Sequence, residues 1–130
     1  MSVLVDTPIW SMLFRRRGPR SAQVAQLRDL VERGQAQIIG PIRQEILSGM
    51  RTSEQFARVR DGLRAFPDIP LRESDFERAA EFYNLCRSKG IQGSNTDFLI
   101  CAVAELNGLQ ILTTDKDFAR FAANLPIELL

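Results

Sequence analysis

Four acidic residues occupy positions from which their side chains could act together: Asp6, Glu45, Asp97 and Asp115. Asp6 directly follows the apolar run VLV (3–5), and Asp115 follows LTT (112–114), so each acid ends a predicted strand. A carboxylate at the end of a buried strand is costly to remove from water unless a proton or a cation neutralises it. The position of Asp6 therefore needs a chemical explanation.

Three of the four acids also have ordinary explanations when each is taken alone. Asp97 suits the positive end of a helix, Glu45 suits a solvated helix face, and Asp115 suits a helix cap. As a set, however, neighbouring carboxylates cannot all stay ionised without a cation. Hard divalent ions take carboxylate and water ligands, polarise phosphoryl oxygens and activate water. We therefore predict a Mg²⁺ or Mn²⁺ site with Asp6 among its ligands.

The composition removes several other kinds of chemistry. The 130-residue chain has no histidine, which excludes histidine general bases, Ser-His-Asp triads and imidazole zinc sites. A haloacid-dehalogenase-type phosphatase needs a second Asp two residues after the first, where this chain has Pro8. The sequence has neither the phospho-accepting Asp of a receiver domain after a middle strand nor a glycine-rich phosphate loop. Carboxylates, lysines and hydroxyls are left as the reactive groups.

Strands and helices are predicted to alternate along the chain. The predicted strands are 2–6, 35–40, 68–71, 109–114 and 127–130. Such alternation favours a mostly parallel sheet of four to five strands with helices on both faces. Ligands of these sheets bind outside the carboxyl ends of the strands, which is where Asp6 and Asp115 are expected.

Two further patterns define the predicted helices. Thr52 with Gln55, and Ser74 with Glu77, have the spacing of capping boxes. The segment 95–108 is apolar on nearly every side, which is typical of a buried helix.

Length and charge limit the class of protein. The chain is predicted to be one domain covering residues 1–130, and no apolar run approaches the roughly 20 residues of a membrane span. Without a signal peptide it is expected in the cytoplasm, with Cys86 and Cys101 as free thiols. The net charge is +6 over residues 9–64 and −4 over 65–130. The basic turn 15–20 is interpreted either as a solvated loop or as a patch for RNA phosphates.

Four segments together resemble the PIN-domain ribonucleases, and within them the short VapC-type toxins of toxin–antitoxin pairs. The segments are VLVDTPIW (3–10), PIRQEIL (41–47), GSNTDFLICAVAELNG (93–108) and ILTTDKDF (111–118). The resemblance covers nearly the whole chain. It implies a three-layer α/β/α sandwich, a Mg²⁺- or Mn²⁺-dependent endoribonuclease, and an antitoxin protein that blocks the site.

The resemblance also implies which residues belong to the site. The family's acids correspond to Asp6, Glu45, Asp97 and Asp115, and Asp117 stands where the family often has an additional acid. Three hydroxyl residues match supporting positions: Thr7, Thr113 and Thr114. Toxins of this family commonly form homodimers, and we expect an interface near helix 96–108 or its neighbour 73–90.

The predicted function is a metal-dependent endoribonuclease toxin that hydrolyses RNA phosphodiester bonds. In-line attack by water leaves a 5′-phosphate and a 3′-hydroxyl. Two alternatives stay open: a metal-dependent phosphomonoesterase of small molecules, and a non-catalytic module that binds Mg²⁺ or a protein. The antitoxin is expected in a groove between the first helices, near the residues Ile9, Leu13, Val24, Leu27 and Val31.

Overall fold

The sheet is built around the short apolar strand β1 (Val3–Val5), whose three residues are all buried. The structure is a computed structural model that describes residues 2–14 and 21–130. β2 (Ala36–Gln37) and β3 (Gln110–Leu112) flank β1, and β4 (Glu128–Leu129) pairs with β3. The strand order is β2-β1-β3-β4 and every pair is parallel. This all-parallel sheet confirms the predicted α/β class.

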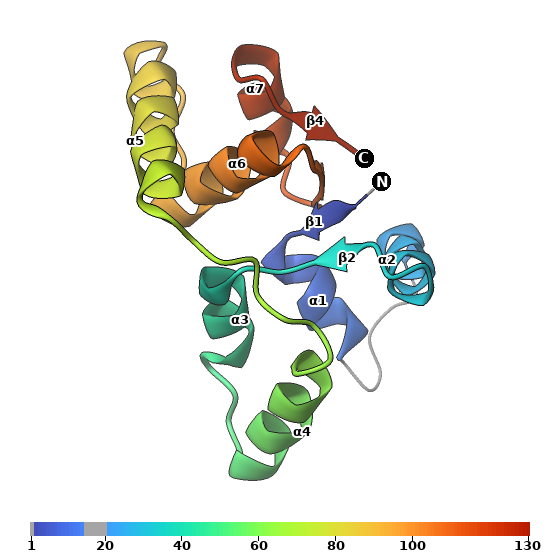
Figure 1. Cartoon of the computed structure of the whole chain (residues 1–130). Coiled ribbons are helices and arrows are strands. Elements are labelled where there is room, and N and C mark those ends of the chain that lie inside the picture. The colour runs from blue at the N-terminus through green and yellow to red at the C-terminus, as the bar shows by residue number, and fades with distance from the viewer. Residues whose placement is uncertain (1, 15–20) are drawn as a thin grey trace.

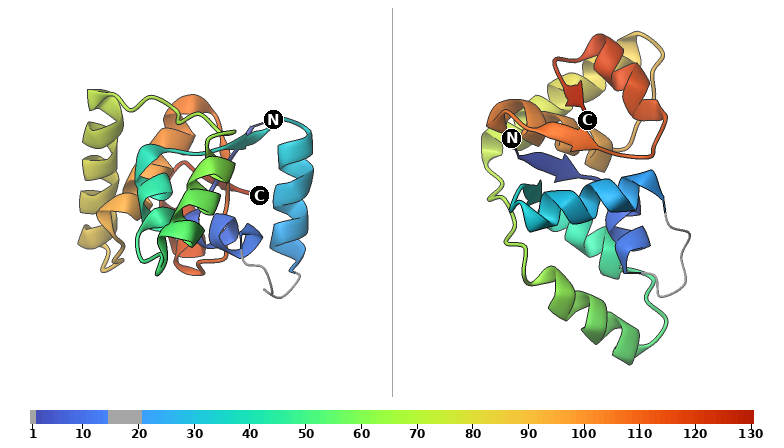
Figure 2. Two further views of the ribbon diagram at one scale, coloured as in Figure 1. Left: turned by 90° about the horizontal axis from the view of Figure 1, so that it is seen from below. Right: turned by 90° about the vertical axis from the view of Figure 1, so that its right-hand side faces the viewer.

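Helices surround the sheet, as the alternation of elements predicts. They are α1 (Thr7–Leu13), α2 (Ala22–Glu32), α3 (Gly40–Leu47), α4 (Ser53–Leu63), α5 (Glu73–Ser88), α6 (Asn95–Asn107) and α7 (Asp117–Asn124). Figure 1 shows the strands between α2 on one side and α5 and α6 on the other, and the first view of Figure 2 again separates α2 from α5. In Figure 1 and in the second view of Figure 2, α4 extends away from the sheet, whereas α3 packs against α1.

The core is centred on α6, whose residues 98–104 are all buried. α6 contacts β1 and β3 and packs most extensively against α5, so both apolar sides of the helix are covered within one chain. On the other side, the buried Trp10 ties α1 to β1, because its indole Nε1–H donates to the Val5 carbonyl oxygen over 3.0 Å. Burial of large apolar side chains stabilises a fold by about 1.5–3 kcal/mol each.

The predicted strand 68–71 is wrong. The structure has only an isolated parallel bridge between Ile38 and Asp68, with a single hydrogen bond from Ile69 N to the Ile38 carbonyl oxygen at 2.9 Å. Pro67 and Pro70 flank the bridge, and a proline has no N–H to donate to a neighbouring strand. The sheet therefore has four strands among the described residues.

The predicted capping box of Ser74 and Glu77 is also wrong. α5 is capped at Arg72, whose backbone N–H donates to Asp75 Oδ2 over 2.7 Å. The predicted cap at Thr52 is present, because the Thr52 hydroxyl oxygen accepts a hydrogen bond from Gln55 N over 3.0 Å. Asp75 is the stronger local acceptor at the start of α5, so the helix begins before Ser74.

The structure does not support the expected antitoxin groove between the first helices. Ile9 and Leu27 are completely buried and Val24 is 8% exposed, so these side chains fill the core between α1 and α2. The basic turn 15–20 lies outside the described residues. Cys86 and Cys101 are free and buried, as predicted. No helix in the described part of the chain is long and apolar enough to cross a membrane.

Candidate active site

Asp6 both ends β1 and begins α1. Its extended backbone lets the side chain accept a hydrogen bond from Thr7 N, with 2.8 Å between Thr7 N and Asp6 Oδ1. Its own N–H donates to the Leu112 carbonyl oxygen, which joins the end of β1 to the end of β3. The side chain is only 6% exposed. A carboxylate is thus held rigidly at the carboxyl edge of the sheet.

Thr113 connects Asp6 with Asp115. The Thr113 hydroxyl donates to Asp6 Oδ2 over 2.8 Å, and its oxygen accepts from the Asp115 backbone N–H over 3.0 Å. Asp115 in turn accepts from the Asp117 backbone N–H through Oδ1, at 2.9 Å. Thr114 is exposed beside them. Of Thr113 and Thr114, which were predicted to support the site together with Thr7, Thr113 is the one that bonds to Asp6.

Asp97 approaches from the first turn of α6. Its Oδ2 accepts from Ser94 N and its own N–H donates to Ser94 Oγ, each at 3.0 Å, so the two residues form a capping box. This box fixes the carboxylate against the helix start. The capping explanation therefore holds for Asp97, and its role as a site residue stays a prediction.

Glu45 approaches from α3 and completes the group. The Thr7 hydroxyl donates to Glu45 Oε2 over 3.3 Å, which links α3 to α1 beside Asp6. Unlike Asp6, Glu45 is exposed to solvent.

All four predicted acids line one pocket of about 540 Å³, together with Thr7 and Thr114. Asp117 does not line this pocket. Three lining residues were not predicted as site residues: Pro8, Ser11 and Met12, of which the last two follow Thr7 by four and five positions on α1. The four-residue helical spacing from Thr7 would have been sufficient to find Ser11. Among the described residues, no three acidic or cysteine side chains lie close enough together to hold a metal ion by themselves. The four acids therefore line the pocket from different sides.

The electrostatics of the pocket favour a cation. Burial raises the pKa of Asp6, while hydrogen bonds from Thr113 and Thr7 lower it, and the nearby charges of Asp97 and Asp115 raise it further. Burial is the largest of these effects, and the pKa of Asp6 is raised overall. The ionised form of Asp6 is therefore disfavoured in the absence of a compensating positive charge. The buried Cys101 thiol has a strongly raised pKa, chiefly because of burial, so it is a packing residue beneath the site.

The sequence matches the PIN domain family over residues 3–124. The chain belongs to the PIN-domain family. Proteins similar in sequence include a VapC ribonuclease of Mycobacterium bovis and Ribonuclease VapC11 of Mycobacterium tuberculosis. Each is 32% identical over 120 residues, and the match covers 89% of this chain and 88% of the relative.

Solved structures share the PIN-domain fold. VapBC2 from Rickettsia felis, bound to a promoter DNA fragment, superposes with a TM-score of 0.77 at 20% identity over 100% of this chain and 98% of that one. A toxin–antitoxin complex from Klebsiella pneumoniae superposes with a TM-score of 0.67 at 26% identity, and the match covers 91% of each chain. FitAcB from Neisseria gonorrhoeae superposes with a TM-score of 0.78 at 16% identity, and the match covers 98% of this chain and 96% of that one. The predicted family and α/β/α architecture are confirmed.

Proposed function

We propose that this PIN domain is a metal-dependent endoribonuclease and the toxin of a toxin–antitoxin pair. The observation that carries the proposal is the convergence of Asp6, Glu45, Asp97 and Asp115 on one pocket at the carboxyl edge of the sheet. The 32% identity to VapC ribonucleases over most of the chain supports the same activity.

The proposed cofactor is Mg²⁺ or Mn²⁺, held by Asp6, Asp97 and Asp115 with Glu45 nearby. The donors are all carboxylate oxygens, which such ions prefer. Mg²⁺ commonly binds through one or two carboxylates and keeps several waters, so an open pocket lined by separate acids fits it better than a closed cage would. Asp117 donates its N–H to Asp115 Oδ1 and is assigned the role of holding Asp115.

The proposed reaction uses the chain's own groups in distinct ways. When bound, the cation supplies positive charge to the phosphodiester and to the attacking water. Thr113 and the Thr7 N–H hold Asp6 in a fixed orientation, so no reorganisation is needed during the reaction. Glu45 is exposed, and its only described hydrogen bond is the long one from Thr7, which suits it to accept the proton of the water.

The expected products follow from this arrangement. A water molecule that attacks in line breaks the bond between phosphorus and the 3′-oxygen, and that oxygen takes up a proton as it leaves. The products carry a 5′-phosphate and a 3′-hydroxyl.

Two partners complete the proposal. An antitoxin protein is proposed because several similar folds come from toxin–antitoxin complexes. An arginine of that partner would match the carboxylates of the pocket and compete with the cation. A homodimer through α5 is also proposed, because Phe76 is 52% exposed beside an apolar groove of about 420 Å³ between α5 and α6.

A cleavage assay on total RNA tests the proposed activity. The protein is incubated with Mg²⁺, Mn²⁺ or EDTA, and the ends of the products are mapped. Cleavage that requires the divalent ion and leaves 5′-phosphates supports the proposal. Hydrolysis of p-nitrophenyl phosphate without RNA cleavage would instead indicate a phosphomonoesterase, and neither reaction would indicate a binding module.

A further inference from the structure

A second cavity lies next to the acidic pocket, on the side of α4. It has a volume of about 640 Å³, within the range of about 300–1,000 Å³ that small-ligand sites occupy. Ser11 and Glu45 line both cavities, so the two lie side by side. We call it the α4 groove and define it by Ser11, Phe14, Glu45, Glu54, Gln55 and Arg58.

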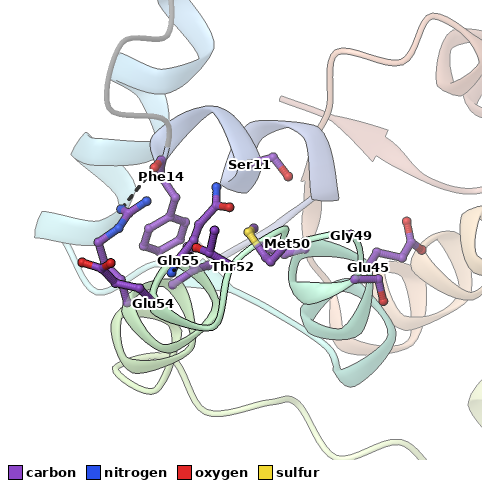
Figure 3. A pocket seen from close by; sticks show the side chains of 12 residues that line it. Ser11, Phe14, Glu45, Gly49, Met50, Thr52, Glu54 and Gln55 are labelled. Carbon is purple, nitrogen blue, oxygen red and sulfur yellow. Dashed lines mark hydrogen bonds between the residues drawn. The ribbon is translucent and has the colours of Figure 1, made fainter.

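The α4 groove is elongated and leads away from the four acids. Figure 3 shows Glu45 at one end, Phe14, Glu54 and Gln55 at the other, and Met50 between them. A ligand with its reacting atom among the four acids could therefore extend along α3 to the start of α4. A strand of RNA has this shape, since each phosphate is followed by a base that can turn away from the backbone.

Two of the three charged side chains that line the α4 groove are acidic, which suits a base better than a phosphate. The third is Arg58, whose guanidinium is bonded to the Phe14 carbonyl oxygen. Glu45 and Glu54 stand at its two ends, and their carboxylates repel a phosphate. Glu54 is exposed and has no ion pair within 4 Å among the described residues. A carboxylate in this state is an available hydrogen-bond acceptor, and acidic side chains accept from the amino groups of bases.

Flat and polar side chains complete a base-binding site. Phe14 is half-buried and places an aromatic ring in the groove. Arg58 uses Nη1 to donate to the Phe14 backbone oxygen over 3.3 Å, drawn as a dashed line in Figure 3. Unpaired RNA bases stack on aromatic rings and on guanidinium planes. The Gln55 amide supplies both a donor and an acceptor for a base edge.

We propose that the α4 groove receives an unpaired base next to the scissile phosphate and selects it through Glu54 and Gln55. The preferred base carries an amino group on its pairing edge, as guanine, adenine and cytosine do and uracil does not. This inference rests on the proposed ribonuclease function and assigns it a sequence preference.

The test uses synthetic single-stranded RNA oligonucleotides around a mapped cleavage site. The nucleotide on each side of the scissile bond is varied among the four bases, and kcat/KM is measured for each oligonucleotide. We expect wild-type protein to prefer amino-bearing bases over uracil at one of these positions by about tenfold, the discrimination typical of a good base-edge contact.

Two variants in the groove and one matched control locate the preference. Glu54→Gln and Gln55→Ala should reduce it to about twofold or less. Both side chains are exposed, so neither change should unfold the protein. Glu73→Gln is the control, because Glu73 is an exposed acid in the first turn of α5 and does not line the groove. It should keep the wild-type preference.

Several outcomes would overturn the inference. The variants could keep the wild-type preference, or they could slow all oligonucleotides equally, and either result removes base selection by the groove. Loss of binding to a co-expressed antitoxin with an unchanged preference would assign the groove to a protein partner. If wild type cleaves and Asp6→Asn does not, these results leave the proposed function intact. If wild type cleaves no RNA, the proposed function fails as well.

Discussion

The Thr113 hydroxyl donates a hydrogen bond to the Asp6 carboxylate, with 2.8 Å between Thr113 Oγ1 and Asp6 Oδ2. The same oxygen accepts from the Asp115 backbone N–H. One side chain therefore fixes two acids that come from opposite ends of the sequence. Their separation in the site depends on the parallel pairing of β1 with β3.

Replacement of Thr113 by valine tests this positioning role. Valine keeps the shape of threonine but removes both hydrogen bonds. We expect activity to fall by about 10- to 100-fold, as for residues that orient metal ligands, and stability to fall by about 1–2 kcal/mol. Thr113→Ser keeps the hydroxyl and should retain most of the activity. Equal activity of the valine variant and wild type would show that Asp6 needs no such support.

Divalent metal should stabilise the folded protein. The acids repel one another in the pocket, and an ion that binds only the native state shifts the folding equilibrium. Each kcal/mol of binding should raise the melting temperature by about 3 °C in a protein of this size. A thermal scan with millimolar Mg²⁺ or Mn²⁺ measures the effect, and a scan in EDTA is its reference. An unchanged melting temperature would count against a metal site.

The same thermal scan separates the effect of the Asp6 charge on stability from its role in metal binding. Because burial raises the pKa of Asp6, its ionised form destabilises the metal-free protein at neutral pH. Asp6→Asn removes this charge, and asparagine can still bond to Thr7 N and Thr113. In EDTA the variant should melt no lower than wild type, and the rise caused by metal should shrink or vanish. A large loss of stability in EDTA would show that the carboxylate holds the fold together.

The ion pair between α5 and α6 gives a prediction about pH. Arg78 contacts Glu105 through two hydrogen bonds of 2.8 and 2.9 Å, and the bond to Arg78 lowers the pKa of Glu105. A lowered carboxyl pKa adds stability above the unfolded pKa, and this is lost as pH falls through the folded pKa. Arg78→Gln should therefore cost about 1 kcal/mol at neutral pH and less near pH 3.

Chemical denaturation at several pH values measures this difference. Arg33→Gln is the control, because Arg33 and Asp29 form a pair whose side chains are 64% and 55% exposed. Exposed pairs contribute little to stability, so the control should change it by less than about 0.5 kcal/mol. A cost of Arg78→Gln that stayed constant down to pH 3 would show that its contact with the Phe82 ring, and not the ion pair, is what matters.

The dimer proposal predicts a dependence on Phe76. Light scattering at tens of micromolar should show a dimer for wild type. Phe76→Arg places a charge on the exposed face of α5 and should give a monomer, because burial of an unpaired charge in an apolar interface is costly. Leu106→Arg, at an exposed position of α6 outside the groove, is the control. A monomeric mass for the wild-type protein in this measurement would contradict the proposed dimer.

The sequence could place the four acids together because the signals for their positions are local, and the pocket that they line agrees with this placement. Asp6 and Asp115 follow apolar runs, and parallel strands place both ends at one edge of the sheet. The two wrong predictions, the cap at Ser74 and the strand 68–71, arise because neighbouring residues override the local pattern. Ser74 has the spacing of a cap, but Asp75 already accepts from Arg72 N. The segment 68–71 has apolar residues, but its neighbouring prolines limit pairing to one bridge.

The α4 groove could not be predicted because distant contacts create it. Arg43 on α3 donates to the carbonyl oxygens of Leu63 and Phe66, which holds the end of α4. Phe14 lies so close to Gly62 that a Cβ atom there would approach its ring to 2.8 Å. Neither contact has a signature in the sequence, because each depends on how α1, α3 and α4 pack.

The central claim is that Asp6 and its neighbouring acids hold a divalent ion for RNA cleavage. The most direct measurement compares wild type and Asp6→Asn on one RNA, with Mg²⁺, with Mn²⁺ and with EDTA, and maps the product ends. We expect cleavage by wild type only with a divalent ion, 5′-phosphate products, and no cleavage by a folded Asp6→Asn variant. Cleavage by Asp6→Asn at the wild-type rate with Mg²⁺ would contradict it.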